Sequence, residues 1–506
     1  MNARLAVAPA VGLRARRTLA PLPAAADALG GAPSAPSSIA SPATKLYPNL
    51  DLDFVPVMTP AEWARGLALA VFTGALHAAF VAKLFTQRLT GGSSPWYVTV
   101  APTLAVAVLT FAIHRYLALE EKEQSRLISE TDAADPDSLF TNVDDVTVHY
   151  KLRRPKKGPP RVVVSCCHGF GANTYSWERC AMSPLANALG AAVIAHDSPG
   201  FGLTARPHDL RKYLPKTNGA ISRAMLDVAS VAYQSMEQRT VPQSPFPKPR
   251  RVVMGHSMGG IAAAVAAGAG DVDDVVLVAP ALIPPRVGVK PRLNPSPKPV
   301  SLMTALCGAL GRFATAVAVY AFAPFLKLFL RKIVRSATFW RRGLSKAVGR
   351  KCAPVFFTDM TWADGYRRPS CVKGWDDGMV RVVLAAATAG VNDVWAAESA
   401  KVAAAMRKES PAVDAPEEMS TDAAATLEAL RCSGARVLIV HGDEDAIVPL
   451  ENSRRLADAL GPEAQLVVMR GCGHMPHEED PDVFVEAVKS FVGEWNPRPT
   501  VRAKKP

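Results

Sequence analysis

Cysteine is scarce in this chain, and no two cysteines stand in a Cys-x-x-Cys pair. Eight cysteines are spread over 506 residues, so the sequence has neither the dense disulfide framework of small secreted domains nor the paired ligands of a zinc module. Isolated cysteines in a large core are usually buried thiols. We therefore expect a reducing compartment, no structural metal and no bound cofactor.

Acidic residues are missing from the amino-terminal stretch. Arginines precede the first acid, Asp27, at Arg4, Arg14, Arg16 and Arg17, and the chain continues as SAPSSIASPAT. Arginine with small and hydroxyl residues and few acids is typical of an organelle transit peptide. We assign residues 1–45 to a transit peptide, with a disordered Ala/Pro-rich tail as the alternative.

Two long runs carry no formal charge. Residues 66–82 read GLALAVFTGALHAAFVA, residues 96–113 read WYVTVAPTLAVAVLTFAI, and the polar turn LTGGSSP lies between them. A membrane-spanning helix needs about 17–25 apolar residues, and aromatic residues such as Trp63 favour the interface. We expect a two-helix transmembrane hairpin, a membrane anchor, over residues 62–118. The alternative is an amphipathic helical pair packed on the rest of the protein.

From about Val146, short β-rich runs alternate with helix-length stretches. The runs VTVHYKL, RVVVSCC, GAAVIAH, RRVVMGH, DVVLVAP, ARVLIVHG and AQLVVMR predict strands. Continuous apolar strands separated by helices indicate an α/β fold with a mostly parallel, doubly wound sheet. Residues 119–143, which are acidic and polar, are expected to be a linker. Functional groups of such a sheet gather at the carboxyl ends of its strands.

A serine between glycines follows the predicted strand RRVVM. In GHSMGG, Ser257 stands between Gly255 and Gly259, and MGGIAAAVAAGA then predicts a helix. This strand–turn–helix context is that of a nucleophile elbow, because small residues permit a sharp turn that lifts the serine above the sheet. The helix N-terminus also favours negative charge at this point. Ser257 is therefore predicted to be a nucleophile.

A serine nucleophile needs a base, and the base needs an orienting carboxylate. The strand ARVLIVHG ends in DEDAIVP, which places Asp443, Glu444 and Asp445 at a carboxyl end of the sheet. The strand AQLVVM ends in RGCGHMPHEEDP, which places His474 in a glycine-flanked loop. The order serine, acid, histidine, each just after its own strand, predicts a catalytic triad.

These motifs resemble the α/β-hydrolase fold superfamily over roughly residues 146–495, with GHSMGG as the elbow, GDEDAIVP as the acid loop and GCGHMPHEEDP as the histidine loop. The resemblance implies that the acid is Asp445. It also implies that the segment HGFGANTYSW, with His168 and Gly169, is the oxyanion loop, and that the backbone N–H groups of Phe170 and Met258 form the oxyanion hole. Residues 144–282 and 432–496 would form the hydrolase core.

A long insertion separates the strand that ends at Pro280 from the strand that starts near Ala435. Such sheets usually have connections of a few residues here, and by resemblance residues 283–431 form a helical cap over the site.

No Asp or Glu occurs from Val275 to Thr358, and FATAVAVYAFAPFLKLFLRKIV is apolar first and then basic. We expect this part of the cap, with Arg331, Lys332 and Arg335, to contact an anionic membrane surface. A buried cap helix with a solvated basic face and a patch for another anionic partner are the alternatives.

The resemblance implies a serine hydrolase of plant or algal type that is membrane-associated and cleaves a lipophilic carboxylic ester. We expect an organelle membrane, with the chloroplast favoured over the mitochondrion and the endoplasmic reticulum. The expected partners are the lipophilic ester and membrane lipid. Nucleic acid is not expected, because the sequence has no basic groove interleaved with aromatic residues. A transacylase with the same triad, or a non-catalytic ligand receptor or scaffold on the same fold, is the alternative function.

Overall fold

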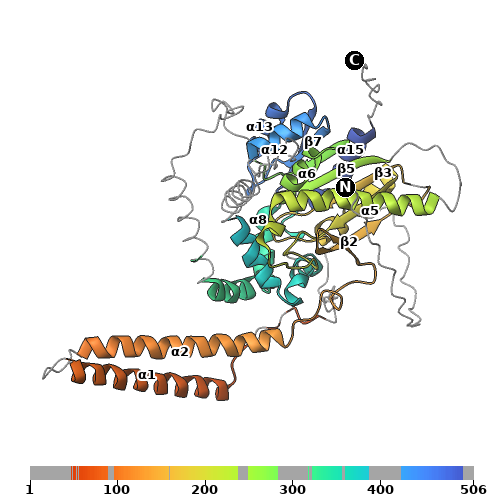
Figure 1. The fold of residues 1–506 in the computed structure, drawn as a ribbon. Coiled ribbons are helices and arrows are strands. Elements are labelled where there is room, and N and C mark those ends of the chain that lie inside the picture. Colours follow the sequence, from red (N-terminus) through yellow and green to blue (C-terminus); the bar gives the residue numbers. More distant parts are fainter. Residues whose placement is uncertain are drawn as a thin grey trace, which may run out of the picture.

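The computed structural model describes residues 47, 50–52, 54, 56–88, 96–158, 160–237, 249–282, 317, 322–355, 359–386 and 423–493. The predicted transit peptide at residues 1–45 lies outside the described residues, as do residues 283–316 and 387–422 of the expected cap. The described part consists of a globular body and a two-helix hairpin that extends from one side of it (Figure 1).

One eight-stranded sheet lies at the centre of the body, in the order β1-β2-β4-β3-β5-β6-β7-β8. Strand β2 pairs antiparallel with β1 and β4, and all other neighbours are parallel. The strands are β1 (Leu139–Val143), β2 (Val146–Arg153), β3 (Val162–Cys167), β4 (Ala191–His196), β5 (Arg250–His256), β6 (Asp274–Val278), β7 (Arg436–Gly442) and β8 (Ala464–Met469). The predicted mostly parallel sheet is therefore confirmed.

Helices cover both faces of the sheet, because the central strands are apolar on both sides. One face packs against α5 (Pro215–Glu237), α6 (Met258–Gly268), α12 (Ala423–Cys432) and α13 (Leu450–Leu460). The other face packs against α3 (Tyr175–Glu178), α4 (Met182–Leu189) and α15 (Pro481–Gly493). Two hydrophobic cores result, one on each side of the sheet, as a doubly wound fold requires.

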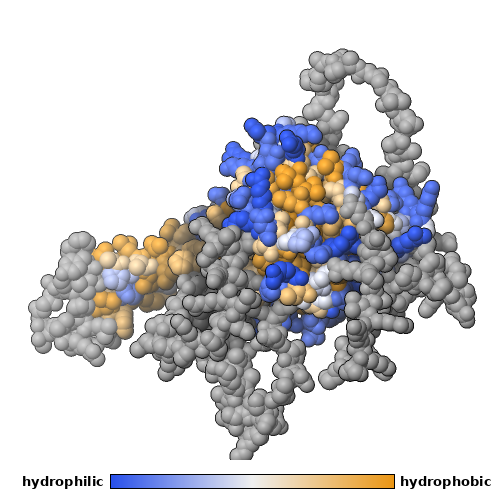
Figure 2. Space-filling view, turned by 90° about the horizontal axis from the view of Figure 1, so that it is seen from above, coloured by the Kyte–Doolittle hydropathy of each residue, from blue (hydrophilic) through white to orange (hydrophobic). Residues whose placement is uncertain are grey.

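The hairpin consists of α1 (Pro60–Arg88) and α2 (Trp96–Gln124), which pack antiparallel. The rings of Trp63 and Phe111 lie 5.2 Å apart, and the hydroxyls of Thr73 and Thr110 lie 3.1 Å apart. By length and composition, residues 60–82 and 100–124 are long and apolar enough to cross a membrane. The outer face of the hairpin is largely hydrophobic (Figure 2). A second apolar area, surrounded by hydrophilic residues, lies on the globular body.

The described part of the cap is helical. It comprises a helix over residues 322–334, α8 (Ala337–Ala347), α10 (Met360–Arg367), the short 3-10 helix η2 (Arg368–Cys371) and a helix over residues 375–386. It packs on the segment that follows β3, where a Cβ added to Gly365 would lie 2.2 Å from the ring of Tyr175.

Residues 119–143 differ from the expected linker. Helix α2 continues to Gln124, Leu127 and Ala133 are buried, and residues 139–143 form the edge strand β1. Ile128 also forms a parallel bridge with Val372 of the cap. The acidic side chains that suggested solvent exposure are partly used in ion pairs with the cap, so this segment is part of the folded body.

Candidate active site

Ser257 lies in a strained turn between β5 and α6. Its backbone has φ 51° and ψ −115°, a left-handed φ that few non-glycine residues adopt. A Cβ added to Gly255 would lie 2.1 Å from the carbonyl oxygen of Gly259, and one added to Gly259 would lie 2.4 Å from that of Cys167. Only glycine fits at both positions, so the turn has the geometry of the predicted elbow.

His474 and Asp445 are hydrogen-bonded, with 2.8 Å between His474 Nδ1 and Asp445 Oδ2. The other carboxylate oxygen accepts from the backbone N–H groups of Ile447 (2.8 Å) and Val448 (2.9 Å), and His441 Nε2 lies 3.0 Å from Oδ2. Burial opposes ionisation of Asp445, but hydrogen bonds from His441 and His474 outweigh it and hold the pKa of this carboxyl well below its usual range. The carboxylate is thus charged and fixed in direction.

The other two acids of the same loop face elsewhere. Asp443 accepts a hydrogen bond of 2.7 Å from the backbone N–H of Gly471. Glu444 pairs with Arg350, whose Nη2 lies 2.9 Å from Glu444 Oε1. Asp445 is therefore the carboxylate of this loop that lies beside His474.

Ser257 and His474 are brought near each other through His256. The ring of His256 lies 4.9 Å from the ring of His474, and its Nε2 donates to the carbonyl oxygen of His474 at 2.8 Å. Within the described residues, no hydrogen bond joins the Ser257 hydroxyl to His474. Nucleophile–base hydrogen bonds are often long in free enzymes and tighten when substrate is bound.

The segment after β3 lies directly against the elbow. His168 is buried, its Nε2 accepts from the backbone N–H of Ser198 at 3.0 Å, and its Nδ1 donates to the carbonyl oxygen of Gly169 at 2.7 Å. Burial lowers the pKa of His168, so the ring is neutral and serves as a brace. A Cβ added to Gly169 would lie 2.9 Å from Nδ1 of His256 and 3.2 Å from the Cβ of Ser257, so a larger residue would force these neighbours to move.

Two backbone N–H groups flank the serine. Phe170 follows Gly169, and Met258 is the first residue of α6. In the part of the chain that the structure describes, neither N–H donates to an acceptor. The oxyanion hole at these two N–H groups stays a prediction.

A carboxylate that the sequence analysis missed organises the loop of His474. Glu479 accepts from the backbone N–H of Gly473 at 2.9 Å and from that of Gly349, in the cap, at 2.7 Å. The backbone N–H of His474 in turn donates to the carbonyl oxygen of Ala347, the last residue of α8, at 2.6 Å. The three acids near the end of GCGHMPHEEDP were the available signal, but spacing alone does not show which backbone groups they bind.

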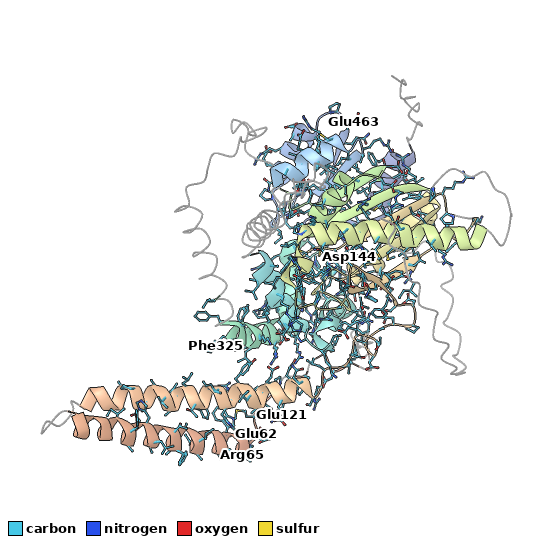
Figure 3. The ribbon with its side chains drawn as sticks, in the orientation of Figure 1. Glu62, Arg65, Glu121, Asp144, Phe325 and Glu463 are labelled. Atoms are coloured by element: carbon cyan, nitrogen blue, oxygen red, sulfur yellow. The ribbon has the colours of Figure 1, made fainter. Side chains whose placement is uncertain are left out.

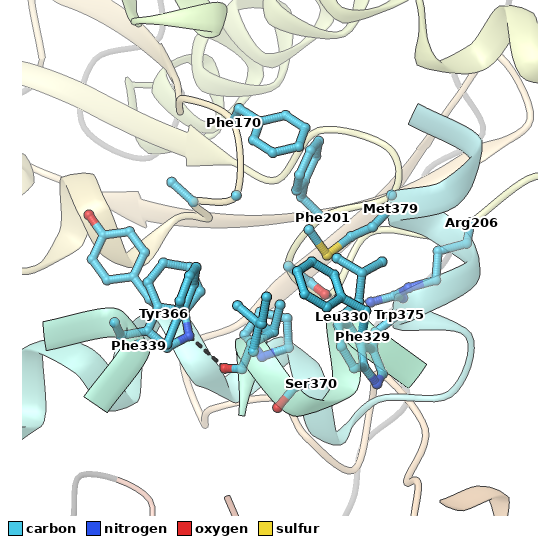
Figure 4. Close-up of a pocket in the computed structure, with 18 residues that line it drawn as sticks. Phe170, Phe201, Arg206, Phe329, Leu330, Phe339, Tyr366, Ser370, Trp375 and Met379 are labelled. Carbon is cyan, nitrogen blue, oxygen red and sulfur yellow. Dashed lines mark hydrogen bonds between the residues drawn. The ribbon is translucent and has the colours of Figure 1, made fainter. Parts of the chain in front are cut away.

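An apolar cavity of about 530 Å³ lies between the loops that follow β3 and β4 and the cap (Figure 4). The oxyanion loop contributes Phe170, whose ring meets that of Phe201 edge to face at 5.5 Å. The cap contributes Tyr366 and Trp375. The cavity is lined almost wholly by hydrophobic side chains, so it fits an apolar group better than a charged one.

Two cations of the cap lie where the sequence analysis did not expect them. Arg331 and Arg335 are buried, with only 4% and 6% of their surface exposed. Arg331 pairs with Glu120 of α2 at 2.8 Å and with Asp376 at 2.6 Å, and Arg335 pairs with Glu123. The prediction that these two arginines face an anionic membrane is therefore wrong, because acids distant in sequence neutralise them. Lys332 is exposed.

Seven cysteines fall in the described part of the chain, and all are free thiols. The same part contains no group of His, Cys, Asp or Glu side chains arranged to hold a metal ion.

The sheet order, with helices on both faces, is that of the α/β-hydrolase fold. Residues 166–487 match the alpha/beta hydrolase family, and the chain belongs to that family.

Two bacterial relatives match short stretches of the chain. The 2-hydroxymuconate semialdehyde hydrolase of Pseudomonas sp. (strain CF600) is 38% identical over 81 residues, which are 16% of this chain and 28% of that protein. The enzyme of the same description from Pseudomonas putida is 38% identical over 65 residues, 13% of this chain and 23% of that protein. The chain thus aligns with no more than 28% of the length of these curated relatives.

Solved structures are similar at lower identity. A serine hydrolase involved in carbazole degradation is 16% identical, with a TM-score of 0.40 over 70% of this chain and 98% of that one. A membrane phospholipase A, described as a bacterial virulence factor, is 18% identical, with a TM-score of 0.37 over 79% of this chain and 97% of that one.

Proposed function

We propose that this protein is a membrane-anchored serine hydrolase that cleaves a lipophilic carboxylic ester through an acyl-enzyme. One observation carries the proposal: a serine in a strained elbow lies near a histidine that is hydrogen-bonded to a buried carboxylate. Strain at a non-glycine residue persists only where the surrounding structure enforces it, and it is common at functional sites.

In the proposed mechanism, His474 Nε2 takes the hydroxyl proton of Ser257 as its Oγ attacks the ester carbonyl carbon. Asp445 fixes the tautomer and stabilises the imidazolium. The N–H groups of Phe170 and Met258 hold the oxyanion, a contribution of about 3–4 kcal/mol per donor in well-studied enzymes. Collapse expels the alcohol, which takes the proton from His474. Water, activated by the same histidine, then releases the acid and regenerates Ser257.

The cavity supports a lipophilic substrate. It adjoins Phe170 of the oxyanion loop and is enclosed by apolar cap residues such as Leu330 and Ile333. An acyl chain or another apolar group would leave water on entering it, which favours binding in proportion to the apolar area buried.

The hairpin supports a membrane location. Helices α1 and α2 expose large apolar side chains on their outer faces, among them Phe72 and Phe80 on α1 and Leu104 and Val108 on α2. Such a surface suits hydrocarbon and is costly in water. We further propose an organelle membrane, with the chloroplast as the first location to test, because of the arginine-rich, acid-poor start of the chain. A fluorescent protein fused to residues 1–45 should enter that organelle, and a diffuse cytosolic signal would exclude the assignment.

A substrate screen tests the catalytic proposal. Wild-type protein should deplete one ester class from a total lipid extract, and S257A should deplete none. The variant S345A, at a partly exposed serine of α8, is the matched control and should behave as wild type. A serine-directed fluorophosphonate should label wild type and S345A but not S257A. Undiminished labelling of S257A would overturn the assignment, and an ester transferred to an added alcohol rather than to water would indicate a transacylase.

A further inference from the structure

The cap helix over residues 322–334 carries a row of exposed aromatic side chains. Phe322, Phe325 and Phe329 have 65%, 66% and 60% of their surface exposed. Spacings of three and four residues place them on one face of the helix. A contiguous exposed row of large apolar side chains marks an interaction surface more often than a surface that faces water. We call these three residues the phenylalanine row.

The same helix forms a wall of the cavity. The side of the helix away from the row lines the cavity with Leu330, Ile333 and Val334. Phe329 belongs both to the cavity lining and to the row. Figure 4 shows Phe329 and Leu330 close together, with Phe170 of the loop after β3 above them. Because Phe329 both lines the cavity and is exposed, an opening of the cavity at the phenylalanine row follows from the geometry.

Buried ion pairs fix this helix to the base of the hairpin. Arg331 pairs with Glu120 in the last turns of α2 at 2.8 Å, and both Nη atoms of Arg335 bind the carboxylate of Glu123. The backbone carbonyl of Phe54, in the segment before α1, also accepts from Arg335 at 3.3 Å. The helix is thus held at the base of the hairpin, both by the end of α2 and by the segment before α1.

The apolar surface of the hairpin continues toward the row. Leu117 and Ile113 precede Glu120 by three and seven residues, so they lie on the face of α2 that meets Arg331, and both are more than half exposed. Phe325 projects from the cap on the side to which the hairpin extends (Figure 3). Any bilayer that covers the outer face of α2 therefore approaches the row as well.

We infer that the phenylalanine row enters the lipid bilayer beside the hairpin, and that the ester reaches Ser257 from the bilayer through the mouth at Phe329. The inference rests on the proposed function for its substrate, but the contact with lipid does not depend on turnover. Arg331 and Arg335 are neutralised by acids of the chain itself, so the contact of the row with lipid does not depend on these two cations. A small ester in water can reach the same serine without the row.

An environment-sensitive label tests the contact directly. The full chain with C307S and C432S would carry F325C labelled with nitrobenzoxadiazole and be reconstituted into phosphatidylcholine vesicles. V483C, at an exposed apolar position of α15, is the matched control. The F325C label should shift its emission to shorter wavelength relative to the V483C label, equally at low and high salt. Equal emission wavelengths of the labels at the two positions would overturn the inference. Energy transfer between labelled copies that persists on dilution with lipid would also overturn it, since the row would then face another copy of the chain.

Kinetics test the route of the substrate. F325E should lower kcat/KM on a long-chain ester embedded in phosphatidylcholine vesicles by about tenfold or more, because a charged side chain resists transfer into hydrocarbon. The same variant should turn over a short water-soluble ester at the wild-type rate, since Phe325 does not line the cavity. V483E should change neither rate. Equal loss on both esters, or loss on neither, would overturn the route. Absence of turnover of both esters by wild type would refute the proposed function, while the label still decides whether the row contacts lipid.

Discussion

Arg335 and Glu123 meet in a buried two-pronged ion pair that joins the cap to the hairpin. Arg335 Nη1 lies 2.7 Å from one carboxylate oxygen of Glu123, and Nη2 binds the other oxygen and, at 3.0 Å, the carbonyl of Ser370. Glu123 is fully buried at the end of α2. The position of the cap above the site therefore depends on a residue of the helix pair proposed to anchor the protein.

Breaking this pair should destabilise the protein strongly. E123A leaves the charge of Arg335 buried without its carboxylate partner, which typically costs about 3–5 kcal/mol. The double variant E123L with R335M removes both charges and should recover most of the loss. The control E121A changes an exposed neighbour and should leave the melting temperature within a few degrees of wild type. Equal melting of E123A and E121A, measured in detergent, would show that the pair does not hold the cap.

Substitution of the proposed catalytic residues should lower kcat far more than substitution of their neighbours. H474A should lower kcat on a soluble ester by about 10⁶ and D445N by about 10⁴. D443N is a matched control, because Asp443 bonds to Gly471 rather than to His474. Its kcat should stay within a few-fold of wild type. A loss of kcat in D443N as large as that in D445N would show that Asp445 is wrongly assigned as the orienting acid.

Much of this site could be read from the sequence because its signals are local. The elbow, the acid loop and the histidine loop each follow a strand, and the parallel order of the sheet brings strand ends together. The sequence could not show that Arg331 and Arg335 are neutralised, because Glu120 and Glu123 lie about two hundred residues earlier in the chain. The strand β1 was missed for a related reason. Its sequence LFTNV has the mixed exposure of an edge strand and follows an acidic stretch that resembles a linker.

Glu478 should make stability depend on pH. Burial raises its pKa to about 7, against hydrogen bonds from Tyr366 and Trp362. Between its ordinary value of 4.5 and about 7, the native state keeps a proton that the unfolded chain releases, so stability falls as pH rises through this window. E478Q removes the titrating group. It should therefore flatten the slope and gain on the order of 2–3 kcal/mol over wild type above pH 7.

Thermal unfolding of wild type, E478Q and the exposed-site control E486Q at pH 5 and pH 8 measures this effect. E486Q should follow wild type at both pH values. If the melting curves of wild type and E478Q move in parallel with pH, Glu478 does not carry the dependence.

The elbow should not tolerate a methyl group. G255A would place a carbon 2.1 Å from the carbonyl oxygen of Gly259, so the turn must move and both folding and fluorophosphonate labelling of Ser257 should suffer. G343A adds the same group in α8, where no atom lies within 4 Å, and should stabilise that helix by about 0.5–1 kcal/mol. Full labelling of G255A at wild-type stability would show that the elbow is not needed.

Membrane retention should depend on the outer part of the hairpin. Replacing residues 71–107 with a short Gly/Ser linker keeps the contact between Trp63 and Phe111 and the ion pairs at the base. The shortened protein should leave the membrane in a carbonate wash and still take the fluorophosphonate label, whereas the full chain should stay in the pellet. Release of the full chain by salt alone would refute a membrane-spanning hairpin.

The backbone bonds between the cap and the loop of His474 limit how the site can work. Rotation of the cap away from the core would break the hydrogen bonds that Ala347 and Gly349 make with the segment that carries the base, and would therefore displace His474. A substrate path that keeps these bonds would run between side chains that move while the backbone stays fixed. The enzyme would accordingly select among esters by the width and length of the acyl chain, and not through an equilibrium between open and closed conformations of the cap.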